Sequence, residues 1–150
     1  MRPTVHLFLV LALTTTSCAG THPSDRPVSG VQPTSIGSDQ PVEVPEDAVD
    51  NTGAGRVVVA VTDNAFEDRI IVVDAGTTVV WVNEGRNDHN VRPAEEDRRP
   101  GWFREVPKAV LADGGAGSVT FEQAGDFPYF CSFHGTARRG QRGRVIVVPG

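Results

Sequence analysis

The chemistry of this chain starts from one thiol and two imidazoles. Cys131 and His134 stand three residues apart in "YFCSFHG", and His89 lies in the earlier stretch "WVNEGRNDHNV". Taken singly, either histidine reads more readily as a solvated or structurally bonded loop residue. Taken with Cys131, the only cysteine after the N-terminal region, they offer three ligands of the kinds that bind transition metals.

The donor types narrow the choice of metal without naming it. Two imidazoles and one thiolate, with a weak fourth donor on the axis, are used by blue-copper electron-transfer sites. Zinc accepts the same donors, so the ligand types alone leave both metals open. A thiol outside the cytoplasm oxidises or cross-links if it is exposed, and a metal bond would protect it.

The part of the chain after Gly55 reads as short strands. No stretch in it keeps the apolar spacing of a helix over three turns, and turn residues separate the β-branched runs. The pattern predicts an all-β fold, an antiparallel sandwich or barrel in one domain over residues 56–150. The runs are "RVVVAV", "RIIVV", "TTVVWV", "GSVTFE", "FPYFC" and "RVIVV".

Strand periodicity places Phe127, Tyr129 and Cys131 on one face, so the thiol continues an inward-facing aromatic row. Residues 92–113 break the strand rhythm with prolines and mixed charges. We expect them to form a long excursion over one end of the sandwich, with one helical turn. Trp81 and Trp102 are expected to serve as core and cover.

The motifs around these residues resemble those of the cupredoxins, in particular the small plastocyanin-like and pseudoazurin-like bacterial members. The resemblance is carried by "VVWVNEGRNDHNV", "FPYFCSFHG" and "GQRGRVIVV" and covers residues 56–150. It implies a Greek-key β-sandwich, one copper ion cycling between Cu(I) and Cu(II), and His89, Cys131 and His134 as ligands. It also implies that Asn90 hydrogen-bonds the cysteine sulfur and ties the two ligand loops together; the alternative is an ordinary turn asparagine.

The chain departs from the family pattern at the axial position. Cupredoxins usually carry a methionine before the last strand, but the only methionine here is Met1. "GQRG" instead places Gln141 there, and stellacyanin-like plant proteins use such a glutamine through its amide oxygen. The alternative is a surface Gln141 and a three-coordinate copper.

The N-terminal residues predict export. Residues 1–17 carry one positive charge, a short apolar run and small residues before Cys18, as a lipoprotein signal does. Lipidation of Cys18 would anchor the protein to the membrane, at its outer face or in the periplasm; plain secretion is the alternative. Residues 18–55 are rich in Pro, Ser and acids and are predicted to form a disordered tether.

The net charge and the distribution of arginines indicate which partners the protein could bind. The formal net charge of -5 provides no overall basic surface for nucleic acid. Arg138, Arg139 and Arg142 follow the second histidine, with Arg144 close behind and no acid among them. They are expected to face a redox partner with an acidic docking surface; the alternative is a solvated loop.

These features predict an extracytoplasmic one-electron carrier and not an enzyme. A module that buffers or delivers copper is the second hypothesis, and a small copper enzyme with an open coordination position is the third. The sequence has no nucleophile elbow or phosphate-binding glycine loop. The run Glu95 to Asp97 is not the opposed carboxylate pair of a glycosidase.

Overall fold

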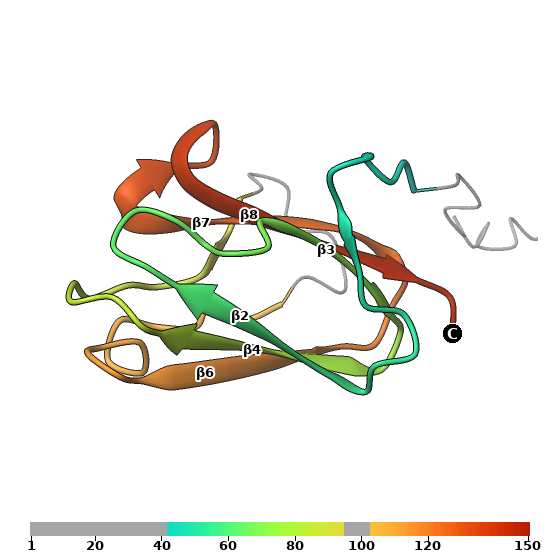
Figure 1. The fold of residues 1–150 in the computed structure, drawn as a ribbon, viewed down its shortest axis with the longest axis horizontal. Helices are drawn as coiled ribbons and strands as arrows, with labels where there is room; N and C mark the ends of the chain where they lie inside the picture. Colours follow the sequence, from blue (N-terminus) through green and yellow to red (C-terminus); the bar gives the residue numbers. More distant parts are fainter. Residues whose placement is uncertain (1–41, 95–102) are drawn as a thin grey trace, which may run out of the picture. The chain divides into compact units, whose positions relative to one another are not determined.

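The computed structural model describes residues 42–94 and 103–150, which form two facing β-sheets (Figure 1). Within these ranges there is no helix, and hence none long and apolar enough to cross a membrane. One sheet has the strand order β1-β3-β8-β7-β5 and the other β2-β4-β6. The strands are β1 Val49–Asp50, β2 Arg56–Val61, β3 Ile70–Asp74, β4 Thr77–Asn83, β5 Arg92–Pro93, β6 Ala116–Phe121, β7 Gly125–Thr136 and β8 Arg139–Val148.

The sheets are mixed, whereas the sequence pattern predicted antiparallel pairing. β2 and β4 pair in parallel, as do β3 and β8, while β7 and β8 are antiparallel. The cause is the path of the chain, which passes from β2 to β3 in the other sheet and then back to β4, so that β4 runs in the same direction as β2. The prediction of an all-β sandwich is confirmed.

Aromatic side chains fill the space between the sheets. Trp81 from β4 and Tyr129 from β7 are both fully buried, and their rings meet edge to face with centroids 5.3 Å apart. Such edge contacts add to the free energy gained from burying the rings. Phe127, Tyr129 and Cys131 are all buried, so the predicted inward-facing row and the core role of Trp81 are confirmed.

The structured part begins before the predicted boundary at Arg56. β1 pairs with β3 through Val49 and Asp50, and the Gly53 backbone N–H donates to the Asp74 carboxylate at 2.6 Å. The end of the predicted tether is therefore held against the first sheet. Cys18 and the signal residues lie outside the described residues.

Part of the predicted excursion lies across the loop that carries His89. Val91 and Val106 exchange backbone hydrogen bonds of 3.0 Å, and residues 108–113 form turns and bends with no helix. Trp102 and the acidic run Glu95 to Asp97 fall outside the described residues. The described part places residues 103–111 beside the candidate site.

Candidate metal centre

Two of the chemistry-bearing side chains come from an irregular stretch of β7. Residues three apart in a regular strand point to opposite faces, so Cys131 and His134 could not share a ligand there. Between Phe130, opposite Arg142, and Gly135, opposite Gly140, β7 advances by five residues while β8 advances by two. This bulge bends the strand and turns both side chains to the same side.

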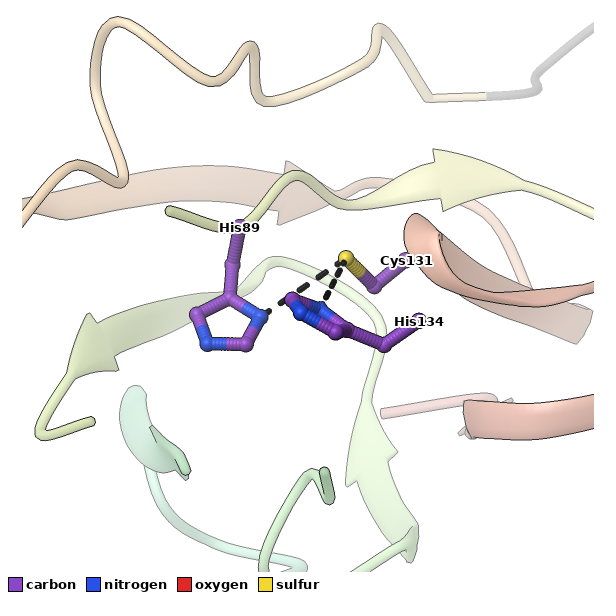
Figure 2. A group of neighbouring side chains, drawn as sticks. All are labelled: His89, Cys131 and His134. Atoms are coloured by element: carbon purple, nitrogen blue, oxygen red, sulfur yellow. Dashed lines mark hydrogen bonds between the residues drawn. The ribbon is translucent and has the colours of Figure 1, made fainter. Parts of the chain in front are cut away.

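His89 joins them from the loop after β4. Its Nδ1 lies 3.7 Å from the Cys131 sulfur, and the Nδ1 of His134 lies 3.6 Å from that sulfur. Figure 2 shows the His89 side chain meeting those of Cys131 and His134, with both rings directed at the thiol. The structure thus brings together the three ligands predicted from the sequence.

The spacing and chemistry of these donors fit one transition-metal ion. Typical bonds are about 2.3 Å to thiolate sulfur and about 2.0 Å to imidazole nitrogen, so one ion can bridge donors up to about 4.3 Å apart. Both sulfur–nitrogen distances are shorter than that limit, and the three ligand atoms all lie within 4.8 Å of one another. Burial lowers the pKa of His89 below its ordinary value of 6.5, which favours the neutral imidazole that binds metals.

Gln141 is buried beside this group and is not a surface residue. Its Nε2 donates to the backbone carbonyls of Thr62 at 3.1 Å and Ala65 at 2.9 Å. The two bonds fix the orientation of the amide, and its oxygen lies 3.1 Å from the Nδ1 of His89. The side chain therefore presents its acceptor oxygen to the site, as an axial donor would.

Asn90 ties the two ligand loops together, but not through the sulfur as predicted. Its Oδ1 accepts the Ser132 backbone N–H at 2.9 Å, and its Nδ2 donates to the Ser132 hydroxyl at 3.0 Å. No hydrogen bond joins Asn90 to Cys131 in the part of the chain that the structure describes. The residue after the first histidine therefore holds the residue after the cysteine.

Two further side chains shape the His89 loop. The buried Asn83 donates through Nδ2 to the carbonyls of Asn87 and Leu111. Asp63 accepts the backbone N–H groups of Arg86 and Asn87 at 2.7 and 3.1 Å, and these bonds lower the pKa of its carboxyl group. Asn83 belongs to the stretch "VVWVNEGRNDHNV" on which the family resemblance rests, whereas nothing local distinguishes Asp63 from a turn residue.

The arginines fall into two groups. Arg138 and Arg139 are exposed at the turn between β7 and β8, and Arg142 donates to the backbone carbonyl of Ala137 at 3.2 Å. Arg144 instead makes two bonds, of 2.6 and 2.8 Å, to the Asp126 carboxylate, so its charge is compensated.

The second histidine lies nearer the surface than the first. His134 is half-buried, while His89 and Cys131 are fully buried. Phe133, directly before His134, keeps 52% of its surface exposed. The site therefore approaches solvent through one imidazole and an adjacent aromatic ring.

Comparisons with known proteins agree with this geometry. Residues 54–148 match the family "copper binding proteins, plastocyanin/azurin family". Plastocyanin of Scenedesmus fuscus is 33% identical over 85 residues, covering 55% of this chain and 85% of the relative. Amicyanin of Paracoccus versutus is 31% identical over 115 residues, covering 75% and 76%.

Among solved structures, a copper-containing nitrite reductase from Thermus scotoductus matches with a TM-score of 0.53 and 27% identity over 63% of this chain. The match covers 23% of that enzyme, so it shows a shared domain. With a family match over most of the folded part and three donors grouped as one metal site, the chain belongs to the plastocyanin/azurin family of copper-binding proteins, the cupredoxins.

Proposed function

We propose that this protein is a one-electron carrier whose copper is held by His89, Cys131 and His134, with the amide oxygen of Gln141 as a weak axial donor. Bound copper supplies a centre that alternates between Cu(I) and Cu(II). The side chains supply the rest. They hold the ion in one geometry, exclude water from most of it and leave the His134 ring near the surface.

The observation that carries this proposal is that the donors are held in place by the protein itself. His89 and Cys131 are fully buried, and two backbone carbonyls fix the amide of Gln141. A site fixed in this way needs little rearrangement when the charge of its ion changes. Fast electron transfer benefits from that property, because every rearrangement adds to the barrier.

The same burial argues against a copper-delivery module, which must release its ion to a partner. It also argues against an enzyme with an open position, because Gln141 fills the space beside His89. The nitrite reductase does not favour an enzyme here, since the match covers only 23% of it.

The carrier and delivery hypotheses differ in how the ion is retained. We expect the copper-loaded chain to pass through repeated ascorbate reduction and ferricyanide oxidation with its copper and visible spectrum intact. A Cu(I) chelator such as bathocuproine sulfonate, added during the cycles, should leave most of the copper bound to the protein. Rapid and complete removal by the chelator would support delivery and contradict the carrier.

We further propose that the protein is exported and lipid-anchored through Cys18, which rests on the signal-like residues 1–17. The anchor would keep the carrier at a membrane surface. Mass spectrometry of detergent-extracted protein tests the anchor. A mature chain that begins at Cys18 and carries acyl groups supports it, and an unmodified Cys18 contradicts it.

The proposed partner surface contains Arg138, Arg139 and Arg142, for an acidic redox protein. Its sign can be tested with an anion, because the formal net charge of the whole chain is -5. If the local arginines govern encounter, the rate of Cu(I) oxidation by ferricyanide should fall as ionic strength rises from ~0.01 to ~0.15 M, over which the screening length falls from ~30 to ~8 Å. If the net charge of the chain governs encounter, the rate should rise with ionic strength, and the proposed partner surface would be refuted.

Replacing the three arginines together with serine should reverse the slope of that salt dependence. The matched control is Arg56→Ser, which removes an exposed charge at the start of β2. The control should keep the slope of the unaltered chain. Equal slopes in the triple variant and the control would remove the steering role of the arginines.

A further inference from the structure

A carboxylate from the segment 103–111 is the outermost member of a hydrogen-bonded chain that ends beside the cysteine ligand. The Oε1 of Glu105 accepts from the Nδ2 of Asn90 at 2.9 Å, and Asn90 in turn bonds both the backbone and the hydroxyl of Ser132. The other carboxylate oxygen lies 3.4 Å from the Nε of Arg92. Glu105 is thus connected to the residues directly after His89 and Cys131.

A cation from the same segment contacts the residues directly before both histidines. The Nζ of Lys108 lies 2.7 Å from the Asp88 carboxylate and 5.7 Å from the centroid of the Phe133 ring. Asp88 precedes His89, and Phe133 precedes His134. Segment 103–111 therefore reaches both ligand loops with two side chains of opposite charge.

Backbone bonds hold the segment itself against the His89 loop. The backbone N–H of His89 donates to the carbonyl of Leu111 at 3.1 Å. Two residues after His89, Val91 exchanges reciprocal backbone hydrogen bonds with Val106. Glu105 thus projects from a backbone that is already fixed relative to one ligand.

We infer that Glu105 is a positioning residue for the metal ligands, which keeps the Cys131 loop in register with the His89 loop before an ion binds. The inference rests on the proposed ligand set. Asn90 is 4% exposed, so its donor needs an acceptor, and a charged acceptor forms the stronger bond. The Glu105 side chain is itself 40% exposed, much as Asp88 is at 41%. Glu105 differs in that its partner Asn90 is buried, whereas Lys108 pairs with a carboxylate at the surface, where ion pairs contribute little.

The metal-free chain provides the test, with amide hydrogen exchange followed by NMR. The Ser132 N–H reports on the hydrogen bonds that start at Glu105, because it donates to Asn90, which in turn donates to Glu105. Glu105→Ala should speed its exchange about tenfold, since Asn90 loses its charged acceptor and becomes free to leave Ser132. Glu105→Gln keeps an acceptor oxygen and should stay within about threefold of the unaltered chain.

The controls separate this role from a general loss of stability. Glu122→Ala removes an exposed carboxylate just beyond β6 and should leave the Ser132 amide unchanged. The Val79 amide, in the core of β4, should not respond to Glu105→Ala. The inference is overturned if Glu105→Ala leaves the Ser132 amide unchanged, or speeds Ser132 and Val79 equally.

A second measurement uses the copper-loaded chain. Glu105→Ala should alter the hyperfine pattern of Cu(II) in electron paramagnetic resonance while copper remains bound, and Glu105→Gln should restore it. An unchanged pattern in Glu105→Ala would contradict the inference. The exchange experiment contains no metal, so its result does not depend on the proposed function. If the protein fails to bind copper, the exchange result still tests the positioning role of Glu105. If the copper site is normal and the exchange is unchanged, only the positioning role is refuted.

Discussion

Replacing Cys131 with serine is expected to abolish the intense absorption band near the red end of the visible spectrum. The band arises from charge transfer between a thiolate and Cu(II), and a serine hydroxyl cannot supply that electron density at neutral pH. The change in size is small, and the side chain is fully buried, so the effect on packing should be modest. Adding Cu(II) to both proteins and recording their absorption spectra measures the difference.

The chain provides its own matched control for this substitution. Cys18→Ser makes the same chemical change at the other cysteine, which belongs to the predicted signal region, and should leave the band at full intensity. A band that survives Cys131→Ser, or disappears in Cys18→Ser, would defeat the proposed ligand set. A copper-free unfolding curve of each variant shows whether the loss of colour reflects loss of the fold.

The second large effect is expected at the axial position. An amide oxygen is a harder donor than a thioether and favours Cu(II), so Gln141→Met should raise the reduction potential. We expect at least a tenfold shift of the redox equilibrium, which is about 59 mV for one electron. Redox titration of the visible band measures it.

The same substitution removes two bonds to backbone carbonyls. Leaving buried acceptors unpaired costs about 1–3 kcal/mol, so the metal-free variant should also unfold more readily. Gln123→Met, at an exposed position, serves as the control and should alter neither property. A potential that falls or stays constant in Gln141→Met would refute axial ligation by Gln141.

The strands were largely predictable because β-branched runs between turn residues report them directly. The runs beginning at Arg56 and Thr77 match β2 and β4 closely. β7 and β8 extend well beyond their predicted runs, since the polar and charged residues there do not alternate with apolar ones. β1 has only two residues and no pattern of its own, and its pairing with β3 depends on contacts distant in sequence.

The residues of the candidate site also divide into those that could be predicted from the sequence and those that could not. His89, Cys131 and His134 could be predicted because few residue types bind transition metals, and Gln141 followed from its place in a motif. Glu105 and Asp63 could not, because surface carboxylates are common and their importance comes from the backbone and side-chain donors that the fold brings to them. The partner of Asn90 was predicted wrongly for a related reason: sequence proximity to His89 does not specify which atom of the other loop it meets.

The surplus of residues in β7 opposite β8 gives the hairpin two regions with different tolerance to change. On the turn side of the bulge, Gly135 pairs with Gly140 and Thr136 pairs with Arg139, so the turn could be lengthened or trimmed without moving a ligand. Within the bulge, removing a single residue between Cys131 and His134 would reverse the direction of the second imidazole. The turn is therefore free to vary with the partner, while the spacing within the bulge is tied to the ion.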